Sequence, residues 1–137
     1  MILISSNPAS REEPVKYMIL ISHNPASQQV WESFTAAQRA EGWRYYASLN
    51  EDLNASGEMI ISEALADPSL AKRVRVAEDQ VMTTDGPFAE AKEHLAGFFL
   101  VDCESMDRAV EIAGQVPEAM FGLVEVRPVL QLGGADM

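Results

Sequence analysis

Short apolar segments alternate with two longer helical segments along this chain, and their order constrains the fold more than any other feature. Residues 17–21 form a continuous apolar run that is typical of a buried strand. A helical region is expected from Ser27, as its N-cap, to about Ser56, with Gly57 just past its end and Gly42 as a candidate break. Apolar side chains recur through this region near helical spacing, at Trp31, Phe34, Tyr45, Leu49 and Leu53.

The remainder of the chain contains further strand patterns and one more helix. Short strands are expected at residues 59–61, 73–76, 81–84, 97–101 and 123–130. Ser105 is expected to cap a helix whose apolar face consists of Met106, Ala109, Val110 and Ala113. Pro128 predicts that the last strand lies at a sheet edge or ends in a bulge.

The order strand, helix, strand, hairpin, strand, helix, strand predicts an α+β fold. Its economical form is a ferredoxin-like antiparallel sheet with the helices on one face. The uncovered face of such a sheet would expose alternate apolar side chains. Two of these faces packed together would bury them, so the sequence predicts a homodimer.

A local repeat divides the chain near its start. Residues 1–10 read MILISSNPAS and residues 18–27 read MILISHNPAS, with a charged, proline-broken stretch between them. Two copies do not build a solenoid. We therefore expect an N-terminal extension over residues 1–16, one domain over residues 17–131 and a tail over residues 132–137. If residues 1–4 are ordered, they can add an edge strand.

The net charge limits which partners are expected, and the cysteine content limits which cellular compartment is expected. The formal net charge is −11, so the mean field of the protein repels phosphate backbones and anionic lipid. Cys103 is the single cysteine, which rules out an intrachain disulfide and fits a reducing compartment. The sequence contains neither a membrane-spanning apolar run nor an export signal. We expect a cytoplasmic protein that binds neither nucleic acid nor membrane directly.

The segment TDGPFAEAKE, residues 84–93, followed by Gly97-Phe98-Phe99, resembles the Asp-Gly-Pro-Phe signature of the YCII-related proteins. Matching pieces occur in the same order at residues 16–21, 73–75 and 125–129, so the resemblance covers about residues 16–130. It implies the fold of the dimeric α+β barrel proteins and, again, a dimer. One departure is Ala91, which stands where the signature has a threonine and so lacks a hydroxyl.

Asp85 is the first candidate for chemistry, because a Gly-Pro turn at a strand end can hold a carboxylate rigidly as a base or ligand contact. The structural alternative is that Asp85 accepts N–H bonds within its own turn. Related YCII proteins suggest a histidine and aspartate acting as an acid–base pair, which would here join His23 to Asp85. Glu90 and Lys92 are candidate ligand contacts that are equally typical of a solvated turn.

Arg127, in the last strand, is a further ligand-binding candidate, with a surface pair to Glu125 as the alternative. His23, His94 and Cys103 do not share metal-ligand spacing, and no nucleotide-binding motif is present, so we expect neither a metal nor a cofactor.

Two functions are compatible with these residues. The first is a homodimer with a small-molecule pocket between sheet and helices, which either catalyses proton transfer through Asp85 and His23 or only binds a metabolite. The second is a non-catalytic accessory or regulatory protein, since the resemblance implies association with extracytoplasmic-function sigma factors. The sequence leaves open whether the protein is an enzyme.

Overall fold

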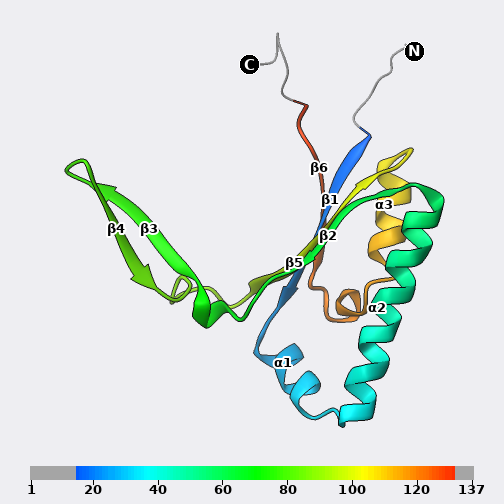
Figure 1. Cartoon of the computed structure of the whole chain (residues 1–137), viewed down its shortest axis with the longest axis horizontal. Helices are drawn as coiled ribbons and strands as arrows, with labels where there is room; N and C mark the ends of the chain where they lie inside the picture. Colours follow the sequence, from blue (N-terminus) through cyan, green and yellow to red (C-terminus); the bar gives the residue numbers. More distant parts are fainter. Residues whose placement is uncertain (1–14, 132–137) are drawn as a thin grey trace.

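The computed structural model describes residues 15–131 (Figure 1). The expected edge strand at residues 1–4 lies outside these residues. Within them the elements occur in the order β1 Lys16–His23, α1 Pro25–Glu32, α2 Ala36–Ser56, β2 Met59–Ala64, η1 Pro68–Leu70, β3 Lys72–Ala77, β4 Gln80–Asp85, β5 His94–Asp102, α3 Met106–Ala113, η2 Pro117–Phe121 and β6 Val124–Pro128. No helix among the described residues is long and apolar enough to cross a bilayer.

Four strands form one antiparallel sheet in the order β2-β5-β1-β6. Helices α2 and α3 lie on one side of this sheet, and the other side has no helix in the described part of the chain (Figure 1). The α+β prediction with helices on one face is therefore confirmed, and the sheet does not close into a barrel within one chain. β6 is an edge strand, as Pro128 predicted.

The helical region after β1 differs from the prediction in its start and in its break. Asn24, and not Ser27, caps α1, while Ser27 at the third helical position completes a capping box. The break falls at residues 33–35, where Thr35 caps α2 with a second capping box. Gly42 lies inside α2, and Gly57 ends that helix with a φ of 83°.

The core lies between the sheet and the helices, and period-two alternation in the strands supplies half of it. Tyr17, Ile19 and Ile21 of β1 point to this side, as do Phe99 and Val101 of β5. The helices add a second set of buried residues: Leu49, Leu53, Ala109, Ile112 and Ala113. On α3 the predicted face was partly wrong, because Met106 and Val110 are exposed and Ile112 is fully buried.

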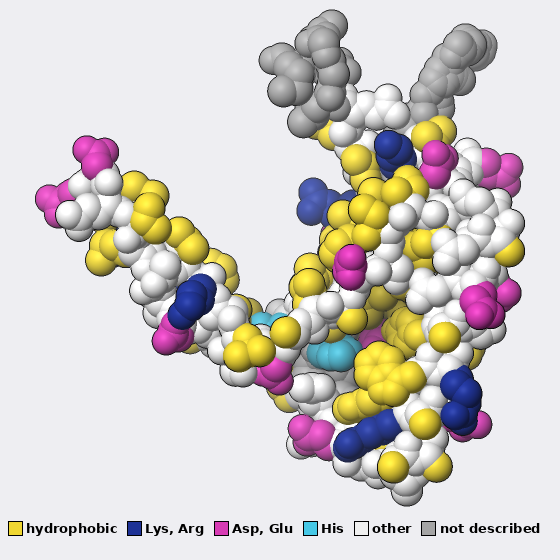
Figure 2. Space-filling model, in the orientation of Figure 1, with side chains coloured by type: hydrophobic (Ala, Val, Ile, Leu, Met, Phe, Trp, Pro, Cys, Tyr) yellow, Lys and Arg dark blue, Asp and Glu magenta, His cyan; other side chains and the backbone are white. Residues whose placement is uncertain are grey.

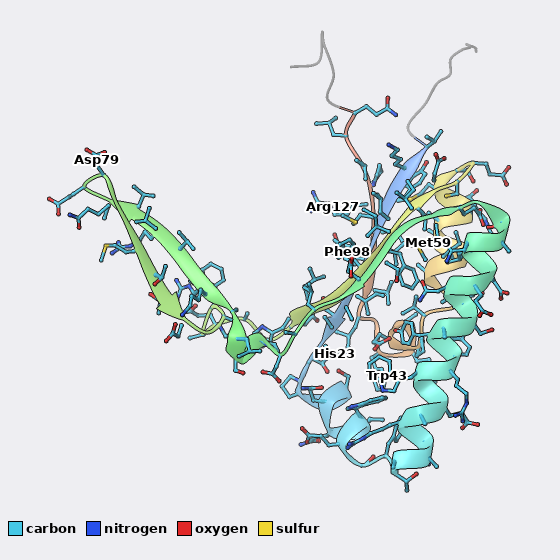
Figure 3. The ribbon with its side chains drawn as sticks, in the orientation of Figure 1. His23, Trp43, Met59, Asp79, Phe98 and Arg127 are labelled. Atoms are coloured by element: carbon cyan, nitrogen blue, oxygen red, sulfur yellow. The ribbon has the colours of Figure 1, made fainter. Side chains whose placement is uncertain are left out.

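The opposite face of the sheet, which we call the open face, carries the alternate residues of the same strands. At its centre lie Met18 and Leu20 of β1, Phe98 and Leu100 of β5, and Ile61 of β2. Figure 3 shows Phe98 and Arg127 on the side away from α2, and Met59 toward the helices. A bulge at Ile60 allows this, because it places Met59 against the core and Ile61 on the open face.

Strands β3 and β4 do not join the main sheet. They form a separate two-stranded hairpin, which we call the arm, and it projects from the ends of β2 and β5 on the side of the open face (Figure 1). Its tip is a two-residue turn in which Glu78 and Asp79 both have positive φ, at 51° and 63°. Pro68 and Pro87 lie where the chain enters and leaves the arm, and neither can donate a backbone hydrogen bond to continue the sheet.

Gly97 is required where β5 passes β2. A Cβ at this position would lie 2.8 Å from the carbonyl oxygen of Glu63. We expect Gly97→Ala to lower the free energy of unfolding by about 1–3 kcal/mol, because the backbone at Glu63 would have to move to make room for the added methyl group. The matched control is Gly114→Ala, where the nearest atom is 3.5 Å away, and its effect should stay within about 1 kcal/mol. Urea unfolding of the two variants measures this, and equal effects would contradict it.

Candidate functional site

His23 is the last residue of β1, and strand alternation sets its direction. Ile21 points to the core and Ser22 to the open face, so His23 points to the helical side of the sheet. In Figure 3 its side chain lies below the sheet, at the level of the lower half of α2. The side chain is 40% exposed, so it is held by the protein and still reaches solvent.

Glu118 links this histidine to Tyr46. Glu118, in η2, accepts a hydrogen bond from His23, with Nε2 and Oε2 3.1 Å apart. The other carboxylate oxygen, Oε1, accepts a short hydrogen bond from the hydroxyl of Tyr46 in α2. The Glu118 side chain is only 17% exposed. The three residues form a chain from a solvent-facing imidazole to a shielded carboxylate and phenol, which we call the His–Glu–Tyr cluster.

The carboxylate of Glu118 is stabilised in its charged form. Burial opposes ionisation, but the hydrogen bonds from His23 and Tyr46 outweigh it and hold the pKa of Glu118 below its usual range. Burial and the neighbouring carboxylate raise the pKa of the Tyr46 phenol far above its usual value. An ionised carboxylate only accepts hydrogen bonds, so Nε2 of His23 carries the proton in this pair.

A hollow of about 330 Å³ lies beside the start of β5. Apolar side chains of Leu65, Leu70, Pro87 and Leu95 line part of it, and His94 and Asp67 provide polar groups. His94 is the register partner of His23, so the two residues stand opposite each other on neighbouring strands. Figure 2 shows the histidines, in cyan, where the arm meets the body of the protein.

The structure does not bring Asp85 to His23. Asp85 ends β4 at the base of the arm, with its side chain 83% exposed, and its Oδ1 lies 2.5 Å from Nζ of Lys72. The two residues are register partners across the hairpin. In the described part of the chain no turn N–H donates to Asp85, and the N–H of Gly86 bonds to the carbonyl of Ala71 instead. Neither the expected turn bonds nor a hydrogen bond to His23 is formed.

The remaining predicted ligand contacts also lie apart from the His–Glu–Tyr cluster. Glu90 and Lys92 are exposed in the loop between β4 and β5. Arg127 lies opposite Met18 on the open face, and Glu125 lies opposite Leu20 on the same face. No ion pair joins Arg127 to Glu125 among residues 15–131. Of the predicted site residues, His23 alone has a shielded charged partner.

Sequence reasoning missed Glu118 and Tyr46. Glu118 is 95 residues from His23 and 72 residues from Tyr46, and no local sequence pattern links positions so far apart. The helical pattern placed Tyr45 on the apolar stripe, yet Tyr45 is exposed and donates to the carbonyl of Gln115 at 2.6 Å. The spacing of Tyr46, Leu49 and Leu53 was the available signal, since these three share one face of α2.

Among residues 15–131 there is no group of three or more His, Cys, Asp or Glu side chains arranged to bind an ion. Cys103 is buried, and burial raises the pKa of its thiol, which disfavours the nucleophilic thiolate. The His–Glu–Tyr cluster consists of titratable side chains, which are groups that can exchange protons.

The antiparallel sheet in the order β2-β5-β1-β6, with helices on one face, places the chain among the ferredoxin-like α+β proteins. The chain belongs to the YCII-related domain family, whose sequence pattern matches residues 15–133. The matched range contains β1 to β6, and so it includes the whole His–Glu–Tyr cluster and the arm.

A curated relative is an uncharacterized protein of Rhizobium meliloti (strain 1021). It is 40% identical to this chain over 67 residues, which cover 47% of this chain and 54% of the relative. The chain thus spans about half the length of that relative.

The lowered pKa of Glu118 predicts an acid-dependent loss of stability. Its contribution is full above the usual carboxyl pKa of 4.5 and is lost as the pH falls through the lowered folded-state pKa. We expect Glu118→Gln to reduce the free energy of unfolding by about 1–3 kcal/mol near neutral pH. The difference from the parent should shrink below pH 4.5. Urea unfolding at a series of pH values measures this.

The control is Glu104→Gln, which removes an exposed carboxylate. That variant should follow the parent at every pH. A Glu118→Gln deficit that stays constant across the acid range would show that shape, and not charge, accounts for the role of Glu118.

Proposed function

We propose that this protein is a homodimeric enzyme that transfers a proton to or from a small molecule at His23. The observation that carries the proposal is the hydrogen bond from half-exposed His23 to the shielded carboxylate of Glu118, which Tyr46 also holds. A histidine oriented by a carboxylate is a general acid–base device that works near neutral pH.

The geometry assigns a role to each atom of the pair. Nε2 donates to Glu118, so Nδ1 carries the lone pair and makes no hydrogen bond within the described part of the chain. Nδ1 can accept a proton from a bound molecule, and the carboxylate then stabilises the imidazolium that forms. Tyr46 keeps Glu118 in place and remains neutral, because its pKa is raised. In this proposal Glu118 and Tyr46 are positioning residues.

The surroundings of His23 suggest the kind of ligand. The hollow next to His94, the register partner of His23, combines apolar side chains with the polar groups of His94 and Asp67. Such a lining suits a small, partly apolar molecule with one acidic proton. Asp85 is assigned no part in proton transfer, because it faces solvent and pairs with Lys72.

A panel of small metabolites tests this proposal by thermal shift. A compound that binds at His23 should raise the melting temperature of the parent, with a stabilisation of about 2.7 kcal/mol at a hundredfold excess over Kd. The shift should be lost in His23→Gln and retained in Asp85→Asn. Binding compounds are then incubated in D2O, where NMR should show proton exchange that depends on His23.

The matched control is Asp85→Asn, which changes an exposed residue of the arm and leaves the Glu118 bond intact. Proton exchange that survives in His23→Gln, or is lost in Asp85→Asn, would refute the assignment. If no compound shifts the parent, the alternative is an accessory protein of a sigma factor system, for which the charge of −11 would favour a basic partner.

The homodimer is supported by the open face of the sheet. Met18, Leu20, Phe98, Leu100 and Ile61 place an apolar strip across three neighbouring strands. Charged residues flank the strip, with Glu63 on β2 and Glu125 and Arg127 on β6. A two-fold axis through the strip would bury its apolar surface and can bring Arg127 of each copy toward a glutamate of the other.

Leu100→Lys tests the dimer. A charge at the centre of the strip would have to be buried unpaired, so we expect the dissociation constant to rise at least about a hundredfold. The control is Val110→Lys, which places the same charge on an exposed position of α3, on the helical side of the sheet. Sedimentation equilibrium measures both. A dimer unchanged by Leu100→Lys would refute packing through the open face.

A further inference from the structure

The arm has no core of its own, and no other part of residues 15–131 covers it. Every residue of β3 and β4 is exposed except Ala77, which is half-buried. Val74 and Val76 are 66% exposed and Val81 is 71% exposed. An isolated two-stranded hairpin is marginally stable in water, so an ordered arm of this kind requires a surface to pack against.

The register of the hairpin concentrates its apolar side chains on one face. Val76 pairs with Val81, and Val74 pairs with Thr83, so these four residues share a face. We call it the valine face. The other face carries Arg73, Arg75 and Met82, and the guanidinium of Arg73 lies 4.2 Å from the ring centre of Phe88. Branched side chains in a row that the described part of their own chain leaves uncovered are typical of an interface.

The arm and the open face form the two sides of a concave angle. Figure 1 shows the arm leaving the sheet on the side of the open face, and Figure 2 shows hydrophobic surface along the arm and along the sheet that it faces. A molecule seated on the open face would lie within this angle. The arm would then contact that same molecule.

A second copy of this chain is the molecule that the proposed homodimer seats on the open face, within this angle. Residues 72–85 hold three basic and three acidic side chains, so the arm carries no net charge. It can therefore approach a copy with a net charge of −11 without strong repulsion.

We propose that the β3–β4 arm clasps a second copy of this chain, with the valine face buried against the body of the partner. The inference rests on the proposed homodimer and adds a second contact region to it. Because the dimer has two-fold symmetry, each subunit both extends an arm and receives one. The arm begins beside the hollow next to His94, and residues at its base line that hollow. Dimerisation through the clasp would therefore hold this wall of the hollow in position.

The test compares two sets of substitutions in the full chain. The first replaces Val74, Val76 and Val81 by threonine, which keeps the β-branched shape and removes apolar surface. The control replaces Ala77, Gln80 and Met82, on the opposite face, by threonine. We expect the first set to raise the dimer dissociation constant at least about tenfold and the control to change it less than about threefold. Circular dichroism confirms that both fold.

Amide hydrogen exchange over residues 72–85 gives an independent measurement on the unmodified protein. These amides should exchange at least about tenfold more slowly above the dissociation constant than below it. Equal exchange at both concentrations, or equal effects of the two substitution sets, would overturn the clasp.

The two proposals fail in different ways. A parent protein that stays monomeric overturns both the dimer and the clasp. A parent dimer that Leu100→Lys dissociates and the threonine set leaves intact overturns the clasp alone.

Discussion

The structure depends on the period-two alternation of β1, the strand next to the edge of the main sheet. Its odd-numbered residues from Tyr17 to Ile21 are buried under the helices, and its even-numbered residues Met18 and Leu20 form part of the open face. The same alternation directs His23 toward Glu118 at the end of the strand. Because helices cover only one face of the sheet in the described part of the chain, β1 contributes to the core, to the candidate interface and to the candidate catalytic site.

The His–Glu–Tyr cluster joins three elements of the fold, β1, α2 and η2, at one carboxylate. Glu118 is held from the sheet by His23 and from α2 by Tyr46. Its own short helix, η2, lies between α3 and β6 and ends at Gly122 with a φ of 71°. A buried carboxylate is stable only when its hydrogen bonds are complete, so the packing of α2 on the sheet fixes the orientation of the imidazole.

Local sequence patterns predicted most helices and strands, but they did not predict contacts between residues that are distant in the sequence. Apolar runs located the strands, and Ser105 correctly marked the start of α3, because these signals lie within a few residues. The sequence did not reveal that β3 and β4 leave the sheet, since Arg73 to Val76 alternate as they would inside it. Asp85 was predicted as a site residue because it lies in a recognisable turn motif. Glu118 carries no motif, and its role follows only from the packing of η2 against α2 and β1.

The bulge at Ala96 gives β5 two segments of opposite phase. From Gly97 to Val101, odd-numbered residues point to the helices, but Ala96 is an extra residue opposite β1, and beyond it the even-numbered His94 takes that direction. A regular strand that kept Ala96 without the bulge would exchange the directions of His94 and Leu95. Deleting Ala96 would instead leave Leu95 opposite Ser22 and His94 opposite His23, so the imidazole would stay on the helical side of the sheet. The bulge at Ala96 therefore decides which of these two side chains lies on the helical side of the sheet, beside His23.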